Sequence, residues 1–255
     1  VLSYFHEYIQ KGGFPEIATG REEPQQYLRE LYRKLIERDI VSRHNIKYKK
    51  TLREITNNIT SNPARLFSYG KIRRQFGLGS DHTVRNYLSY LEEAYLIISI
   101  SKFSFKPIEI EKSEKKIYSI DTGIINTIST QREKDSGHIY ENIVAIELLR
   151  NKSPNKEEEL YYWKNKEQEE VDFVIRQDSK IMQLIQVCKD IRSEDTKKRE
   201  TRALLKASKN LKCKNLLILT EDYEGEETMN WFESKEKIKY LPLWKWLLTD
   251  EKAKQ

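Results

Sequence analysis

The sequence has few of the residues that build covalently or metal-stabilised scaffolds. Its 255 residues include only 2 Cys, Cys188 and Cys213, and they form no C-x-x-C pair, which argues against a disulfide framework or a structural zinc site. No run of about 18 apolar residues occurs, which excludes a membrane-spanning helix. The chain starts at Val1 without a signal-peptide pattern. We therefore expect a cytoplasmic protein with no membrane partner, of which this chain is a piece.

Motifs of several enzyme classes are also missing. No G-x-x-x-x-G-K-[ST] phosphate loop occurs, because the glycines at Gly77 and Gly79 are not followed by lysine. No G-x-S-x-G nucleophile elbow occurs either. The 4 His residues are scattered without metal-ligand spacing. This stretch should not hydrolyse ATP, and any ATP site of the full protein is expected upstream of Val1.

The residues that are present indicate a folded, charged, multidomain protein. Hydrophobic residues make up 38% and aromatics 11%, enough to fill cores, and the length suits one large domain or two to three small ones. The net charge is +6, but it is unevenly spread. Residues 45–106 contain 11 basic and 4 acidic side chains, so this segment carries +7 and the remainder −1. Such a segment suits phosphate backbones, whose condensed counterions are released on binding.

Residues 1–44 read as helices around a turn. Leu2, Phe5 and Ile9 share one helix face, Gly12 and Gly13 end that helix, and a second helix is expected over residues 25–41.

Residues 46–106 have the pattern of a helix-turn-helix with a wing. Val84, Tyr87, Leu88 and Leu91 form a buried stripe on a helix that Ser80 would cap. Strands over residues 96–105 and 116–120 would make the wing. A helix of this kind fits the DNA major groove, with cations on phosphates, although winged helices also bind proteins. The expected double-stranded DNA contacts are Lys71, Arg73, Arg74, His82, Thr83, Arg85, Asn86, Ser89, Lys102 and Lys106.

The last region alternates strands and helices, which predicts a mixed sheet covered by helices. Asp172 interrupts an apolar strand, and Asp is disfavoured there. The hairpin turn at residues 177–180 would bring Gln186 beside it, and a helix carrying Glu141 would complete an oxygen-rich cluster. Such oxygen ligands suit Mg²⁺ or Mn²⁺, and a bound metal can activate water for phosphodiester attack. The expected elements are helices 140–150, 196–209 and 244–248 and strands 160–163, 171–176, 181–188, 216–220 and 238–241.

Several segments resemble one protein family in order along the chain. "KGGFPEI" at 11–17, "LYRKLIERDI" at 31–40, "TVRNYLSYLEEAYLI" at 83–97 and "KIYSIDTGI" at 116–124 resemble the region after the ATPase domain in predicted archaeal and bacterial AAA+-type ATPases. "YENIVAIELLR" at 140–150, "YYWKNKEQEEVDFVI" at 161–175 and "QVCKD" at 186–190 resemble their carboxy-terminal domain, which is similar to the PD-(D/E)XK restriction-endonuclease fold.

This resemblance assigns roles to the candidate catalytic residues. Glu141 matches the helix glutamate and Asp172 the strand aspartate, and these two would be the metal ligands. Gln186 stands at the second acidic position, and the lysine position holds Cys188, with Lys189 one residue later. Because strand side chains alternate between faces, Lys189 should point away from Gln186. Gln186 in place of an acidic residue and Cys188 in place of the lysine both weaken metal binding and catalysis. A degenerate nuclease site is therefore expected.

Together these observations predict an α+β or α/β multidomain protein. Residues 1–44 would be a helical segment following an ATPase domain, residues 45–125 a winged helix-turn-helix domain, and residues 126–255 a restriction-endonuclease-like mixed sheet with flanking helices. The expected function is DNA binding beside an ATPase. Two alternatives are an active Mg²⁺-dependent endonuclease and a module that binds a protein partner or a second copy of itself.

Overall fold

The computed structural model describes residues 1–129, 136–152, 157–231 and 234–249. The chain divides into two compact units. The first unit comprises Val1–Ser99 and Ser113–Ile146, and the second comprises Ile100–Lys112 and Glu147–Gln255. This division differs from the three expected segments, because one hydrophobic core that runs from Ile17 to Ile124 joins residues 1–44 to the helices that follow. Within the described ranges, none of the helices is long and apolar enough to cross a membrane.

The amino-terminal helices are fastened to a later helix by the glycine-rich motif. Gly12, at φ 81°, ends the first helix, and the Gly13 amide donates to Asp121 Oδ2 at 2.8 Å. Asp121 also caps the helix that begins at Thr122. A side chain on Gly123 would meet the Lys11 carbonyl oxygen at 2.2 Å, so glycine is required there. These elements are α1 (Leu2–Lys11), α2 (Pro15–Ala18), α3 (Pro24–Lys34), the π-helix η1 (Leu35–Ser42) and α8 (Thr122–Ile128).

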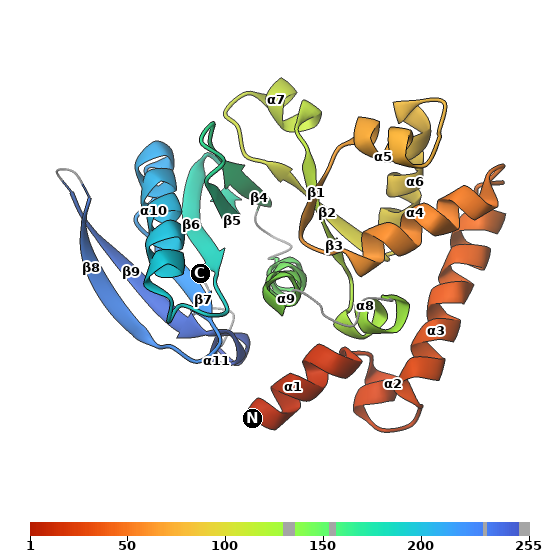
Figure 1. The fold of residues 1–255 in the computed structure, drawn as a ribbon, viewed down its shortest axis with the longest axis horizontal. Coiled ribbons are helices and arrows are strands. Elements are labelled where there is room, and N and C mark those ends of the chain that lie inside the picture. Colours follow the sequence, from red (N-terminus) through yellow and green to blue (C-terminus); the bar gives the residue numbers. More distant parts are fainter. Residues whose placement is uncertain (130–135, 153–156, 232–233, 250–255) are drawn as a thin grey trace. The chain divides into compact units, whose positions relative to one another are not determined.

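The middle of the first unit holds a group of helices beside the first strands of the sheet (Figure 1). Their order along the chain is α4 (Lys49–Ser61), β1 (Arg65–Phe67), α5 (Tyr69–Gln75), α6 (Asp81–Glu93), β2 (Ile97–Lys102) and β3 (Lys115–Ser119). The strand order is β1-β3-β2, and β1 runs antiparallel to β3. The predicted stripe of α6 is buried, as are Leu52, Ile55 and Ile59 of α4.

Helix α9 (Ser136–Arg150) completes the first unit and continues into the second. It is buried on almost all sides from Ile139 to Ile146, so no amphipathic pattern marks its orientation. The Asn142 side chain fastens α9 to β3, because its Nδ2 donates to the Ser119 carbonyl at 2.9 Å and its Oδ1 accepts from the Ser119 amide at 2.8 Å.

The second unit is built on the predicted mixed sheet. The described strands form one nine-stranded sheet in the order β1-β3-β2-β4-β5-β6-β7-β9-β8, of which the end of β2 and the strands from β4 onward belong to the second unit. Strands β4 to β6 are antiparallel neighbours, β6, β7 and β9 are parallel, and β8 returns antiparallel to β9. Helix α10 packs on β5 and β6 (Figure 1). The bounds are α7 (Pro107–Lys112), β4 (Glu158–Lys164), β5 (Glu170–Gln177), β6 (Lys180–Val187), α10 (Glu194–Leu211), β7 (Leu216–Thr220), β8 (Gly225–Trp231), β9 (Ser234–Pro242) and α11 (Leu243–Leu247).

Candidate functional site

Helices α5 and α6 present a capped, polar surface on the first unit. Ser68 Oγ accepts from the Lys71 amide at 3.3 Å, and Ser80 Oγ accepts from the Thr83 amide at 3.2 Å. Both caps satisfy backbone donors in the first helical turn. Because the stripe of α6 faces the core, the residues between its members face solvent, as the sequence predicts.

The basic residues of α5 differ in how freely they are displayed. Arg73 pairs with Asp81 at 3.2 Å, so it ties α5 to the start of α6. Lys71 and Arg74 are exposed, and among the described residues they pair with no carboxylate. Arg85 of α6 is exposed and its guanidinium lies 5.1 Å from the centre of the Tyr69 ring. Lys71, Arg74 and Arg85 are therefore the cations best placed to meet a phosphate backbone.

The uncharged candidates lie along the outer side of α6. His82 Nδ1 and Asn86 Nδ2 are 3.5 Å apart. Thr83 Oγ1 lies 3.1 Å from Ser80 Oγ, within the cap. Ser89 Oγ donates to Glu93 at 3.1 Å. The amino-terminal half of the helix surface is thus polar, whereas its carboxy-terminal end is acidic.

The two expected wing cations lie in the second unit. Lys102 is half-buried at the end of β2, where Ser101 and Lys102 run parallel to β4. Lys106 pairs with Glu109 of α7 at 3.1 Å. Phe103 packs edge-on against Tyr161, with ring centres 5.6 Å apart. This aromatic contact attaches the segment to the second core, so these lysines do not share a unit with α6.

Glu141 is held inside the first unit. Its Oε1 accepts from Lys116 Nζ at 2.8 Å and from the Tyr118 hydroxyl at 2.7 Å. The Glu141 side chain is 9% exposed and that of Lys116 is 3% exposed. Breaking a buried pair of this kind leaves an uncompensated charge. Glu141 therefore stabilises the contact between α9 and β3, whereas Asp172 belongs to the second unit.

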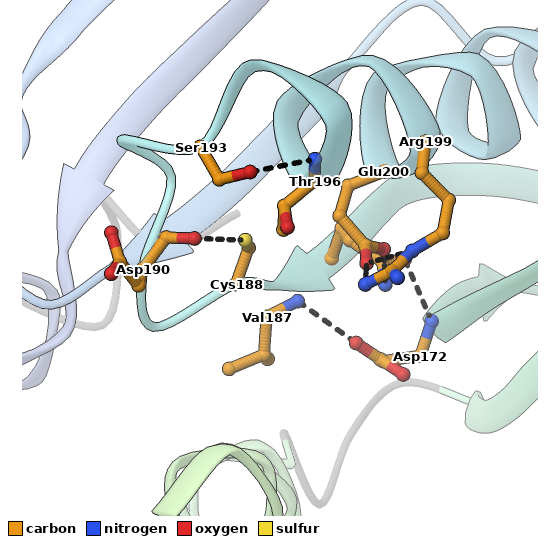
Figure 2. Close-up of polar contacts among 9 residues, drawn as sticks. Asp172, Val187, Cys188, Asp190, Ser193, Thr196, Arg199 and Glu200 are labelled. Atoms are coloured by element: carbon orange, nitrogen blue, oxygen red, sulfur yellow. Dashed lines mark hydrogen bonds and ion pairs between the residues drawn. The ribbon is translucent and has the colours of Figure 1, made fainter.

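Asp172 and Gln186 meet across the β5–β6 hairpin, as the sequence predicts. The Asp172 amide donates to Gln186 Oε1 at 3.3 Å. Asp172 Oδ2 accepts from the Val187 amide at 2.9 Å (Figure 2). Asp172 is 6% exposed and Gln186 is 5% exposed. The carboxylate thus bonds to the backbone of the neighbouring strand in a nearly dry environment.

Two residues of α10, Arg199 and Glu200, complete this cluster and were not predicted from the sequence. Gln186 Nε2 donates to Glu200 Oε2 at 2.8 Å, and Arg199 pairs with Glu200 at 2.6 Å. Burial raises the pKa of Glu200; the Arg199 guanidinium opposes this, and the Asp172 carboxylate adds to it. The available signal was an acid on an apolar stripe, because Glu200 precedes Ala203, Leu204 and Ala207 at helical spacing.

The two residues around the expected lysine position have other environments. Burial raises the pKa of the Cys188 thiol to about 12, and the Glu200 carboxylate contributes. The thiol therefore stays protonated at neutral pH. Lys189 lies beyond the last residue of β6, and its Nζ is 3.4 Å from Glu221 Oε1. No bulge returns it to the hairpin, because the β5–β6 irregularity lies between Ile175 and Arg176.

The donors of this cluster do not fit the expected Mg²⁺ or Mn²⁺ site. The Gln186 amide joins Asp172 to Glu200, and a cation is already supplied to Glu200 by Arg199. In the part of the chain that the structure describes, no group of three or more His, Cys, Asp or Glu is arranged to hold a metal ion. The cluster fastens α10 to the hairpin.

Comparisons with known proteins match both halves of the chain to family models. Residues 2–135 match the model described as a domain of unknown function, DUF8612, and residues 136–246 match a second such domain, DUF4143. An uncharacterized protein of Methanocaldococcus jannaschii is 38% identical over 257 residues, covering 98% of this chain and 56% of that protein. One from Haemophilus influenzae is 27% identical over 228 residues, covering 88% and 54%. The chain thus spans about half the length of these relatives. No solved structure matches it.

Proposed function

The chain belongs to the family described as domain of unknown function DUF8612, and we propose that it is the DNA-binding carboxy-terminal portion of an AAA+-type ATPase. The DUF4143 match supports the second half of this statement, because that domain is found in carboxy-terminal regions associated with AAA-type ATPases. The additional length of the relatives leaves room for such a motor. In this proposal the motor couples its nucleotide state to DNA binding by this region.

The observation that carries DNA binding is the arrangement of the first unit. Helices α4, α5 and α6 and strands β1, β2 and β3 follow one another as expected of a winged helix, with the strands ordered β1-β3-β2, although α7 of the second unit is inserted between β2 and β3. In such a module the helix equivalent to α6 enters the major groove and the preceding helix meets the backbone. The polar side chains on the first half of α6 then face base edges, and Lys71 and Arg74 of α5 face phosphates.

Charge supports nucleic acid over another partner. Lys71 and Arg74 are exposed on α5 and pair with none of the described carboxylates, so they contribute little to folding. Cations that serve folding are recognisable by their partners, as Arg53 is by its contact with Glu37 at 2.6 Å. Unpaired surface cations on one face attract polyanions and release counterions when they bind phosphates.

The test is the affinity of the full chain for a labelled DNA duplex, measured by fluorescence anisotropy. Replacing Lys71 and Arg74 with Ala should weaken binding about tenfold or more. The matched control replaces Arg29 and Arg33 of α3, which are also exposed and on the same unit, and it should bind as the parent does. Equal affinity of the two double variants would refute the assignment of α5. A parent that captures a defined protein but no nucleic acid would instead support the protein-interaction alternative.

An active nuclease is the alternative, in which Asp172 would act with the carboxylate of Glu200, since Gln186 bonds to both residues. The donors present do not fit a Mg²⁺ or Mn²⁺ ion, because Gln186 and Arg199 already engage Glu200. Because these groups are held by Gln186 and Arg199, we expect no cleavage of plasmid DNA in Mg²⁺ or Mn²⁺. Cleavage by the parent that disappears in Asp172→Asn would show that the chain is an active nuclease. Lys189→Ala tests whether the neighbouring lysine takes part.

A further inference from the structure

A second basic surface lies on the first unit, beside α6 and outside the predicted DNA contacts. It consists of Lys47, Tyr48, Lys49 and Lys50, which we call the Tyr48 patch. The chain turns into it at Asn45, which has φ 48°, and Ile46 anchors it in the core at 6% exposure. All four members of the patch are exposed, and Tyr48 is 52% exposed. The local backbone thus presents an aromatic ring among three cations to solvent.

The ring of Tyr48 is not used by the core. Lys47 Nζ lies 5.4 Å from its centre, and the remaining exposed area is open to a ligand. Nearby on the same unit, His44 stacks on Tyr90 of α6, with ring centres 3.7 Å apart and planes at 13°. Ile46, which directly precedes the patch, belongs to the same hydrophobic core as Val84 and Leu88 of α6. The Tyr48 patch therefore lies near α6.

The lysines of the patch do not serve the helix that they begin. Lys49 and Lys50 open α4, and no acidic residue lies in its first turn. Positive charge at a helix amino terminus opposes the helix dipole and disfavours the helix. The Lys50 side chain is 90% exposed, and its Nζ lies 3.9 Å from Glu54 Oε1. An ion pair this exposed stabilises the helix little. An anionic partner therefore explains the lysines of the patch better than the stability of α4 does.

We propose that the Tyr48 patch binds unpaired nucleotides that extend from the duplex held by α5 and α6. Every base has a face that stacks on an aromatic ring, and lysines beside the ring neutralise the flanking phosphates. The preferred ligand is then a duplex with a single-stranded extension or fork. This inference rests on the proposed function and adds the class of DNA structure that is recognised.

The test compares a blunt duplex with the same duplex carrying a single-stranded extension, using the full chain. The parent should bind the extended duplex more tightly. Tyr48→Ala should lower affinity for the extended duplex about tenfold, which is the typical loss of one stacked base, and should leave blunt-duplex affinity unchanged. Tyr48→Phe retains the ring and should retain the preference. Tyr4→Ala removes a tyrosine that is 77% exposed on α1 and should have no effect.

A fluorescent adenine analogue at the first unpaired position adds a local readout. Its emission should change when the parent binds, and that change should be absent with Tyr48→Ala. Equal affinity of the parent for the two probes, or an unchanged preference in Tyr48→Ala, would overturn the inference while duplex binding still upheld the proposed function. A parent protein that binds neither probe would overturn both the inference and the proposed function. The two failures are therefore distinguishable.

Discussion

At the scale of single residues, the β5–β6 hairpin shows how a buried carboxylate serves as a structural joint. Gln186 accepts from the Asp172 amide and donates to Glu200, which a glutamate at position 186 would not do without a proton. The sequence allowed Asp172 and Gln186 to be paired, because a short hairpin fixes which residues face each other. It did not reveal Arg199 and Glu200, because charged residues in a helix usually face solvent. Only tertiary packing determines which of them is buried against the sheet.

The pKa of Glu200 predicts a measurable pH dependence of stability. Its folded pKa is raised above the ordinary value of 4.5, mainly by burial. Stability from this group is therefore present below pH 4.5 and is lost as pH rises through the folded pKa. In Glu200→Gln this loss is absent. The free energy of unfolding of the variant, relative to that of the parent, should therefore increase from acidic to neutral pH. Urea denaturation at several pH values measures it.

The control for this prediction is on the same helix. Glu194 is 83% exposed and pairs with Lys198, so Glu194→Gln should follow the pH dependence of the parent closely. A Glu200→Gln variant whose stability relative to the parent is the same at every pH would show that Glu200 titrates as an ordinary carboxyl.

At the scale of elements, patterns with a clear period were predicted correctly and short or irregular ones were not. The stripe of α6, the strands β5 to β7 and the helix α10 all follow from periodicity and caps. Helix α7 has only the six residues of PIEIEK, and strand β8 reads as a polar loop because its alternating side chains are half-buried or exposed. The motifs KGGFPEI and KIYSIDTGI also proved structural, since Gly13 and Asp121 join them.

The cap of α6 gives a prediction at this scale. Ser80→Ala leaves the Thr83 amide without its acceptor and should lower the free energy of unfolding by about 1 kcal/mol. Ser80→Asn supplies an equivalent side-chain oxygen and should restore stability. Denaturant unfolding followed by circular dichroism measures both. If Ser80→Ala and Ser80→Asn had the same free energy of unfolding, the side-chain cap would not stabilise the first turn of α6.

At the scale of the whole molecule, basic side chains are paired differently in the two units. The excess positive charge lies largely in the first unit, where Lys71 and Arg74 are unpaired by described carboxylates. In the second unit the cations near the hairpin are engaged, as Arg199 is with Glu200 and Arg202 is with Glu169 at 2.8 Å. The sequence located the basic segment, but it placed Lys102 and Lys106 with α6 in one winged-helix domain, because the packing of Phe103 on Tyr161 is a tertiary contact.

The salt dependence of duplex binding tests the central claim most directly. Log affinity plotted against log salt concentration should fall linearly for the parent, with a slope set by the number of phosphates neutralised. Replacing Lys71 and Arg74 with Ala should make that slope shallower by about 2, one for each lost phosphate contact. No duplex binding, or binding with the same salt slope in the parent and this variant, would contradict the assignment of α5 and α6 as the DNA-binding surface.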